Sequence, residues 1–478
     1  MADFSRRNWM AALAMAGVSS LGGRSVGGAP PHTGMLMGQA HGNESPLSSF
    51  ARNVLEFGAR GDAKTDNTAA FQKALDAVHA AGGGIVLVPA GRFLFKGHLT
   101  MPSNTALLGV FAGPPAGFFG KLAKGTVLMP TEGRGHPDGP AFISVRGVNC
   151  TIRGLGIYYP QQHADAAAPA PYPWTIQNIS RPPTGHPPFG GDGSAGLSVI
   201  DVNLTNAYQG IDLTLARRHY IDRVFGRPIL IGIYVDQCYD TGRIENAHFV
   251  WPFWPCGIPI TKWIQDHGTA FRFGRSDGQY VFNTVCLQYH TGYHFVQTPS
   301  GSCYGNFLGL GADSTFEAIR VDAGQPDGGL LFTNGLFVAM VGAEAQGFVI
   351  GPKNTGQVIM NNCAFWGLSN RIGTIQGTGP VSLIGCNFQN WDKNNRGEPA
   401  VLCDGAPATI SQCLFFLSGT RKAIAITKRC ATAVITGNTF QGKAFVVDRP
   451  GPLPRAKFQI HSNVATGKDT SAYHRASA

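Results

Sequence analysis

The stretch NVLEFGARGDAKTDNTAAFQKALDAVHAAGGGIVLVPAGRFLF, residues 53–95, contains a helix signal followed directly by a strand signal. Asp66 is a suitable N-cap, and an apolar stripe at helical spacing follows it: Phe71, Ala74, Leu75 and Val78. Three glycines at 82–84 end the helix, and residues 85–88 predict a buried strand that Pro89 ends. We therefore expect a short helix whose apolar side packs against the start of a β-rich structure.

Three segments of this stretch carry a resemblance: FGARGD (57–62), TDNTAAFQKALD (65–76) and GGGIVLVPAGRF (82–93). This opening resembles that of the pectate-lyase-like superfamily, whose members are related to rhamnogalacturonases and to glycoside hydrolase family 28. The resemblance implies an all-β fold, a right-handed parallel β-helix with an N-terminal capping helix. It also implies a group of polysaccharide hydrolases, lyases and some phage tailspikes. We expect a single such domain over residues 50–470.

The resemblance stops short of the catalytic motifs of that superfamily. The N-T-D, D-D, G-H-G and R-I-K motifs of family 28 do not occur in order, and the clustered aspartates of calcium-dependent pectate lyases are missing. Galacturonan hydrolysis is therefore in doubt, and no site residue can be assigned from the family. The candidate site has to come from the repeats.

Repeats in the C-terminal half support a β-solenoid. The segments VIMNNCAF, VSLIGCNF, ATISQCLF, AVITGNTF and KFQIHSNV align, which makes five residues equivalent: Cys363, Cys386, Cys413, Asn438 and Ser462. Their separations of 23, 27, 25 and 24 residues correspond to one coil each. A single coil cannot close a core, so coils must stack with strands about 4.8 Å apart.

Several of the ten cysteines fit the same repeats: Cys363, Cys386 and Cys413 share one inward position, and Cys403 and Cys430, 27 residues apart, share another. We expect cysteine to fill space as a small apolar residue and to remain a free thiol; disulfides, which an exported protein can form, are the alternative. The sequence has no CxxC pair and no HExxH motif, and we therefore predict no metal site and no cofactor.

Composition and charge narrow the class of partner. The chain has 478 residues, 64 of them glycine, with 43% hydrophobic and 14% charged residues, which is typical of a folded, turn-rich protein. Its net charge of +10 suits an acidic polymer such as a uronate polysaccharide. The basic residues are scattered, without a basic helix or zinc-finger spacing, so we expect no nucleic acid partner. The oligomeric state is left open.

The N-terminal segment predicts export. Arg6 and Arg7 precede the apolar run 11–18, as in a twin-arginine signal; a Sec signal and a frayed basic N-terminus are the alternatives. We assign residues 1–40 to the signal and a linker, and expect a periplasmic or secreted protein. No later run is long and apolar enough to span a bilayer, so we expect no membrane insertion of the mature form.

Five further segments align as consecutive coils of one sheet: QGIDLT (209–214), IYVDQC (233–238), TAFRFG (269–274), GYHFVQ (292–297) and EAIRVD (317–322). The alternation of inward and outward residues then predicts a solvent-facing column: Asp212, Asp236, Arg272, His294 and Arg320. We take the first four as catalytic candidates. Two aspartates on adjacent coils raise each other's cost of ionising, which suits acid–base chemistry on a polysaccharide.

An aromatic insertion and three polar residues complete the candidate site. WPFWPCGIPITKW, residues 251–263, lengthens one coil, and its rings could stack on sugars: Trp251, Phe253 and Trp254. Just before it, Arg243, Glu245 and His248 point outward in the same alternation, and with Arg320 we assign them to substrate binding. Each assignment has a structural alternative: a salt-bridged ladder for the column, a structural pair for Arg243 and Glu245, and a plug or oligomer contact for the rings.

Two functions remain open from sequence. The first is an exported glycoside hydrolase or polysaccharide lyase that acts on a plant- or algal-type, possibly acidic, polysaccharide in a groove of the β-helix. The second is a non-catalytic carbohydrate-binding or surface β-solenoid. Convergence of Asp212, Asp236 and Arg272 in a cleft beside the tryptophans would favour the enzyme, whereas a flat face of paired charges would favour the second function.

Overall fold

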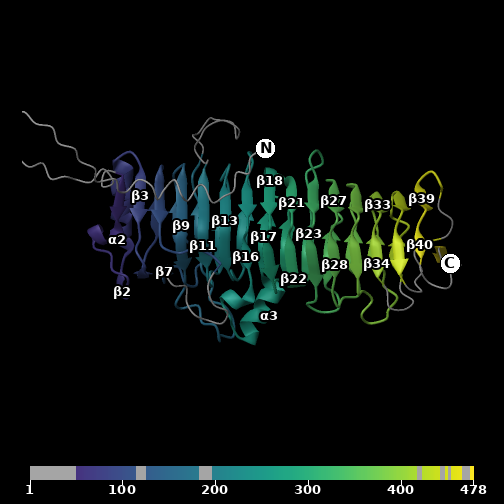
Figure 1. The fold of residues 1–478 in the computed structure, drawn as a ribbon, viewed down its shortest axis with the longest axis horizontal. Coiled ribbons are helices and arrows are strands. Elements are labelled where there is room, and N and C mark those ends of the chain that lie inside the picture. The colour runs from purple at the N-terminus through teal and green to yellow at the C-terminus, as the bar shows by residue number, and fades with distance from the viewer. Residues whose placement is uncertain are drawn as a thin grey trace, which may run out of the picture. The chain divides into compact units, whose positions relative to one another are not determined.

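The computed structural model describes residues 50–114, 125–181, 196–416, 422–441, 447–450, 454–465 and 474–477. The predicted export signal and linker at residues 1–40 lie outside these residues. Within the described part, parallel strands stack coil upon coil into two sheets, one of 27 strands and one of 14 strands (Figure 1). This arrangement confirms the predicted parallel β-helix.

The 14-stranded sheet receives one strand from each coil. Its strands are β5 (Leu99–Met101), β8 (Ile143–Val145), β10 (Trp174–Asn178), β12 (Gln209–Asp212), β14 (Ile231–Val235), β17 (Thr269–Phe273), β20 (Thr291–Phe295), β23 (Glu317–Val321), β26 (Gln346–Ile350), β29 (Gly373–Ile375), β32 (Val401–Cys403), β35 (Ile424–Ile426), β38 (Val447–Pro450) and β41 (His474–Ser477).

The 27-stranded sheet receives two strands from each later coil. It begins with β1 (Ala51–Asn53), β2 (Asp62–Asp66), β3 (Gly84–Leu87), β4 (Gly91–Phe95), β6 (Thr105–Leu108), β7 (Thr126–Pro130), β9 (Cys150–Ile157), β11 (Leu197–Leu204) and β13 (Tyr220–Gly226). One ladder then continues through β15 (Arg243–Glu245), β18 (Ser276–Phe282), β21 (Cys303–Leu308), β24 (Leu330–Thr333), β27 (Val358–Asn361), β30 (Val381–Ile384), β33 (Ala408–Ser411), β36 (Ala433–Thr436) and β39 (Phe458–His461). A second ladder continues through β16 (His248–Phe249), β19 (Val285–Leu287), β22 (Gly311–Thr315), β25 (Leu336–Ala339), β28 (Ala364–Trp366), β31 (Asn387–Gln389), β34 (Leu414–Phe416), β37 (Thr439–Gln441) and β40 (Val464–Ala465).

A corner residue with positive φ separates these two ladders in many coils. Asn246 and Asn283 adopt φ angles of 54° and 51° between their two strands, a left-handed conformation that asparagine tolerates better than most residues. The side chains of these residues also form a ladder, because Asn283 Nδ2 donates to Asn246 Oδ1 over 2.8 Å. The corner therefore turns the chain from one ladder to the next while its amides link the coils.

The predicted helix is α2 (Thr68–Ala80), which follows the 3-10 helix η2 (Val54–Phe57). Its apolar stripe is buried as predicted, and the helix packs against β1, β3, β5 and β6 at the N-terminal end of the β-helix (Figure 1). The N-cap differs from the prediction: Asn67 occupies that position, while Asp66 Oδ1 accepts a hydrogen bond from the Thr68 amide over 3.0 Å.

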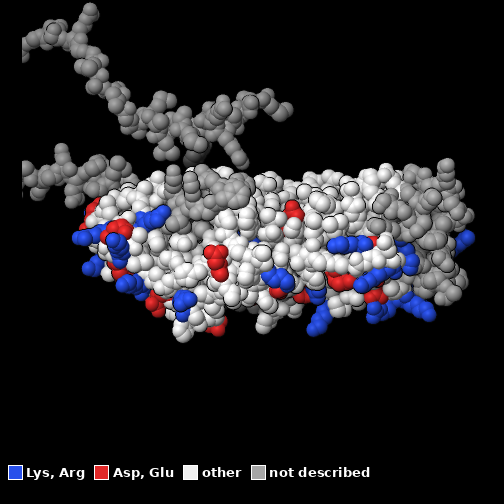
Figure 2. Space-filling model, turned by 90° about the horizontal axis from the view of Figure 1, so that it is seen from below, with Lys and Arg blue, Asp and Glu red and all other residues white. Residues whose placement is uncertain are grey.

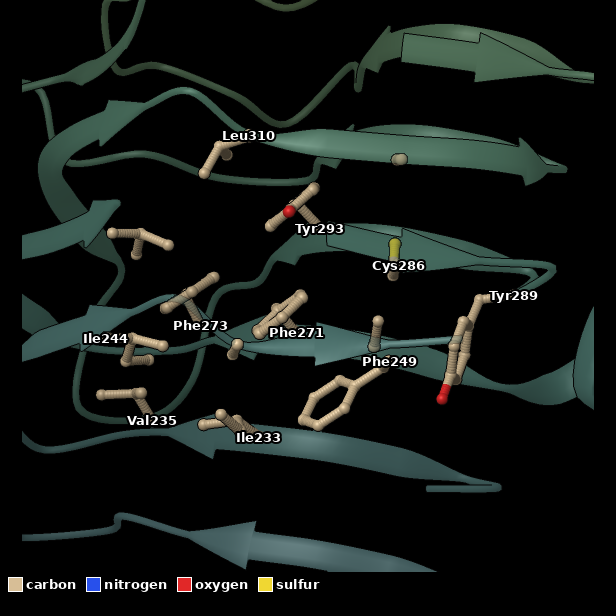
Figure 3. Close-up of a cluster of buried hydrophobic side chains, with 14 of the residues drawn as sticks. Ile233, Val235, Ile244, Phe249, Phe271, Phe273, Cys286, Tyr289, Tyr293 and Leu310 are labelled. Carbon is tan, nitrogen blue, oxygen red and sulfur yellow. The ribbon is translucent and has the colours of Figure 1, made fainter. Parts of the chain in front are cut away.

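Stacked rings fill the interior of the β-helix. The ring centroids of Phe249 and Phe271 lie 5.2 Å apart and those of Phe271 and Tyr293 lie 5.0 Å apart, both pairs near parallel (Figure 3). The predicted cysteine stack is confirmed, because backbone hydrogen bonds join Cys363 and Cys386 to the next coils, and all ten cysteines are free thiols. These inward residues fix which side chains of each strand face outward.

The last coil shows a one-residue error in the repeat alignment. Ala433 pairs with Phe458 rather than with Lys457, so the equivalent of Asn438 is Asn463 and not Ser462. Accordingly, Asn438 Nδ2 donates to Asn463 Oδ1 over 2.9 Å.

Candidate functional site

The outward column of the 14-stranded sheet contains a tyrosine where the sequence predicted an aspartate. Asp212 pairs with Tyr234, Tyr234 with Arg272, Arg272 with His294, and His294 with Arg320. β14 begins at Ile231, and this residue, not Ile233, pairs with Gln209. The predicted register was therefore wrong by two residues at this coil, and Asp236 lies just beyond the end of β14.

Asp212 lies at the end of β12 with most of its surface covered. Only 6% of the residue is exposed, so the expectation of a solvent-facing carboxylate is wrong. Its Oδ1 accepts hydrogen bonds from the Thr214 amide and hydroxyl, and its Oδ2 accepts one from Gln177 Nε2 over 2.9 Å. Burial raises the pKa of Asp212, and repulsion from Asp236 adds to the rise, while the hydrogen bonds from Thr214 and Gln177 oppose it.

Asp236 lies close enough to Asp212 for their charges to interact. It too is only 6% exposed, so it does not face solvent as predicted. Its Oδ1 accepts a hydrogen bond from the Arg275 amide over 2.7 Å and one from the Thr298 hydroxyl over 3.0 Å. Each of the two carboxylates is thus buried and has its own hydrogen-bond donors.

Tyr234 stands between these carboxylates and Arg272. Burial raises the pKa of its hydroxyl, and the charge of Asp236 raises it further. The ring of Trp174 stacks on Tyr234 with centroids 6.3 Å apart, and the Arg272 guanidinium lies 5.7 Å from the Tyr234 ring centroid. Arg272 forms no ion pair within the described residues, and its buried Nε has no hydrogen-bond partner there. In this part of the chain it is therefore a cation without an acidic partner, and it lines a pocket.

A pocket of about 520 Å³ opens beside this cluster, lined in part by Arg272, His294, Arg320, Asp322 and Lys353. Two of the predicted residues are paired with acids. His294 Nε2 lies 2.8 Å from Asp322 Oδ2, and Arg320 contacts both Asp322 and Glu317 at 2.7 and 3.0 Å. His294 and Arg320 thus match the alternative in which the column is a ladder of salt bridges. Arg272 does not match it, because it has no acidic partner within the described residues.

The aromatic insertion folds as the 3-10 helix η3 (Trp251–Phe253) and helix α3 (Ile258–His267), which lies below the strands in Figure 1. Trp254 is only 7% exposed and belongs to the hydrophobic core, so the prediction that it stacks on sugars is wrong. Phe253 packs edge-on against Phe225 and His248, with centroids 5.9 and 5.3 Å apart.

A buried arginine attaches the insertion to the β-helix. Arg227 is fully buried, and its guanidinium donates to Cys256 Sγ over 3.2 Å and to Thr261 Oγ1 over 3.4 Å. Burial lowers the pKa of Arg227. These contacts and the burial of Trp254, Ile260 and Ile264 show that the insertion packs against the β-helix.

We expect Trp254→Ala to destabilise the fold by about 3 to 5 kcal/mol, because it removes a large ring from a packed site. Denaturant unfolding of the purified chain measures this loss. Trp366→Ala is the matched control, since Trp366 is exposed and its loss should change stability by less than about 1 kcal/mol. Weaker polysaccharide binding by Trp254→Ala at unchanged stability would restore the sugar-stacking role.

Arg243, Glu245 and His248 do not join the column. Arg243 and Glu245 lie on β15 and His248 on β16, all in the 27-stranded sheet, so their assignment to one site with the column is wrong. The corner at Asn246 separates β15 from β16, so Arg243 and Glu245 lie on one ladder of that sheet and His248 on the other. His248 packs on Phe253, and burial lowers its pKa.

Sequence analysis missed several residues of the cluster. Trp174 and Gln177 come from the coil before Asp212 and Lys353 from a later coil, and none of these coils was aligned. Asp322 ended the aligned segment EAIRVD but was not chosen as a site residue. Among the described residues, no group of three or more His, Cys, Asp or Glu side chains is placed to bind a metal ion. Nor does this part of the chain contain a helix long and apolar enough to cross a bilayer.

Figure 2 shows the charge on one face of the molecule. Basic and acidic side chains lie interspersed there, and most of that surface is uncharged. On this face the net positive charge is not gathered into one continuous basic surface.

Comparison with known protein families finds a match for the N-terminal part of the chain. Residues 51–180 match the family model described as rhamnogalacturonase A/epimerase, pectate lyase-like. With the parallel β-helix, this match confirms the predicted resemblance to the pectate-lyase-like superfamily.

Curated relatives match a shorter segment. Mannuronan C5-epimerase AlgE3 of Azotobacter vinelandii is 47% identical over 68 residues, which cover 13% of this chain and 4% of the relative. Alginate lyase 7 of the same organism is 44% identical over 68 residues, covering 13% of this chain and 8% of the relative. The match therefore spans a small part of these relatives.

One solved structure illustrates the likeness in fold. The N-terminal fragment of bacteriophage phi29 gene product 12 superposes with a TM-score of 0.55 at 15% identity, over 89% of this chain and 72% of that chain. At this identity the likeness concerns the fold alone.

Proposed function

We propose that this protein is an exported enzyme that cleaves an acidic polysaccharide by β-elimination on the outer face of the 14-stranded sheet. Two observations outside the site support an acidic polysaccharide: the net charge of +10, and relatives named as mannuronan epimerases and an alginate lyase. The paired Arg6 and Arg7 support export.

The site residues have distinct roles in this proposal. Arg272 binds the carboxylate of a uronate residue and so favours loss of the proton from the adjacent carbon, C5. Asp236 accepts that proton, a double bond forms between C4 and C5, and the C4–O bond breaks. Asp212 gives its proton to the departing glycosidic oxygen, a role that its raised pKa suits.

A single observation carries the proposal. Arg272, a cation without an acidic partner in the described residues, lies over Tyr234 beside the carboxylate pair of Asp212 and Asp236. A solvated salt-bridged ladder would pair each arginine with an acid, as Arg320 is paired with Asp322. A uronate carboxylate would supply the partner that Arg272 lacks.

Hydrolysis is the second candidate, and the two carboxylates favour it. In a glycosidase, one carboxylic acid protonates the leaving oxygen while the other activates water or attacks the sugar. Asp212 would keep its role as acid, and Asp236 would act as the base or nucleophile. The non-catalytic alternative draws support from His294 and Arg320, whose charges are already paired.

The products of the reaction separate these possibilities. We expect the purified chain, incubated with alginate and with polygalacturonate, to release unsaturated ends seen by ultraviolet absorbance in step with new reducing ends from at least one polymer. A neutral galactomannan is the control and should release neither. Reducing ends without unsaturated ends would replace elimination by hydrolysis, and neither signal from any polymer would point to a non-catalytic solenoid.

A further inference from the structure

A second pocket, of about 370 Å³, lies on the 27-stranded sheet. It is built by two outward rows that run across β15, β18, β21 and β24. In one row Arg243 pairs with Tyr280 and Tyr280 with Asn306; in the other, Glu245 pairs with Phe282 and Phe282 with Leu308. The residues that the sequence assigned to the substrate site thus meet two aromatic rings on another face of the β-helix.

The rings of this pocket are available to a ligand. Tyr280 is 48% exposed and Phe282 is 45% exposed, although outward positions of a sheet that faces water usually carry polar residues. Leu308 beside them is 40% exposed. Ring surface that the fold itself does not bury marks a candidate interaction site.

Polar groups alternate with these rings. The exposed side chain of Arg243 forms no ion pair within the described residues, and Glu245 lies near enough to Tyr220 for its charge to help raise the pKa of the Tyr220 hydroxyl, after burial and the charge of Asp222. Asn306 and Thr333 add an amide and a hydroxyl to the lining. A ligand that fits must offer flat C–H faces to the rings and hydroxyl groups to the polar side chains, and a pyranose sugar offers both.

We propose that this pocket is a second saccharide-binding site, which holds a polysaccharide chain by stacking its sugars on Tyr280 and Phe282. It goes beyond the proposed function, because binding here requires no cleavage and no residue of the 14-stranded sheet. Both rings stand on β18, two residues apart, so a glycan that runs along this strand, across the helix axis, can stack one sugar on each ring, with Arg243 on the neighbouring coil beside Tyr280. Such a site would keep the enzyme on its polymer between reactions.

The test is native affinity electrophoresis in gels that contain alginate, polygalacturonate or galactomannan. We expect at least one of these polymers to retard the wild-type chain. In the Tyr280→Ala/Phe282→Ala double variant the apparent dissociation constant should rise about tenfold or more, because both stacking surfaces are lost. The Tyr280→Phe/Phe282→Tyr variant keeps both rings and should keep the retardation.

Matched controls separate binding from folding and from catalysis. Leu336→Ala removes an exposed apolar side chain outside the pocket and should leave retardation unchanged. Circular dichroism and thermal unfolding establish that the double variant is folded, and its turnover of short oligosaccharides should equal that of the wild type. If the wild type is retarded but cleaves no polymer, and the double variant is not retarded, this site is supported and the proposed function is overturned.

Three results would overturn the inference. The first is retardation of the folded double variant equal to that of the wild type, and the second is no retardation of any variant by the three polymers. The third is a change of oligomeric state, measured by light scattering, in a double variant that is still retarded. That result would assign the rings to a contact between protein chains.

Discussion

Asp212→Asn is expected to reduce turnover of the acidic polysaccharide by about 10² to 10⁴-fold, the usual contribution of a positioned acid or base. The amide keeps the size of the side chain and can still hydrogen-bond to Gln177 and Thr214. It cannot give a proton to the glycosidic oxygen. Initial rates on the polymer that the product assay identifies measure the loss.

The raised pKa of Asp212 gives this prediction a pH dependence. If the protonated form is the acid, the rate of the wild type should fall as pH rises through that pKa. The free energy of unfolding should also fall as pH rises. The folded chain holds the proton more tightly than the unfolded chain, so the free energy of unfolding falls as pH rises from the ordinary carboxyl range through the raised value. Because Asp212→Asn removes this titration, the variant should be at least as stable as the wild type at neutral pH.

Asp222→Asn is the control for burial. Asp222 is as buried as Asp212 but lies on β13 of the other sheet, where it pairs with Arg223. We expect its substitution to change stability and to leave turnover within a few-fold of the wild type. If Asp212→Asn turns over the polymer at the wild-type rate, Asp212 is not the general acid, and its proton is not transferred to the glycosidic oxygen.

The sequence predicted the fold well because two of its signals recur regularly along the chain. Inward residues such as Phe271 and Tyr293 recur once per coil, and within a strand the side-chain direction alternates with a period of two. The opening of the chain adds the helix and its apolar stripe, which the structure confirms at Phe71 and Val78.

The register of β14 could not be predicted from the same signals. A slip of two residues returns every side chain to the same face, so the hydrophobic pattern fits Asp236 and Tyr234 equally well as partners of Arg272. The alignment that put Asp236 in the column placed two aspartates on adjacent coils. The strand begins at Ile231, however, which puts Tyr234 in the column instead. Only the length of the turn before β14 decides between the two, and turn length varies from coil to coil.

Two other features depend on contacts distant in sequence. Nothing local distinguishes Trp254, which is buried in the core, from Tyr280, which is exposed. The corner at Asn246, which separates Arg243 and Glu245 on β15 from His248 on β16, was likewise not recognised, although Asn334 and Asn362 repeat it in later coils. Aligning those asparagines would have placed His248 on a different ladder from Arg243 and Glu245.

Arg272→Gln tests whether the candidate site recognises a carboxylate. We expect kcat/KM on the acidic polymer to fall about 10² to 10³-fold, the usual loss when one preorganised donor to a developing negative charge is removed. We expect a large effect because Arg272 does not have to break an ion pair within the described residues before it binds a carboxylate. Its guanidinium lies over the Tyr234 ring, and its Nε is buried without a hydrogen bond in the described residues. Arg429→Gln is the matched control, since Arg429 pairs with Asp404 on a distant coil and should not affect turnover.

A methyl-esterified substrate sharpens this test. Esterification removes the negative charge that Arg272 is proposed to bind, so Arg272→Gln should lose much less activity on the ester than on the free acid. The ratio of the two losses is a double-mutant cycle between the arginine and the substrate carboxylate. Equal losses on both substrates would show that Arg272 supports Tyr234 and the fold around it rather than the sugar. The carboxylate would then have to bind among Arg320, His294 and Lys353, where acidic partners already compete for the first two.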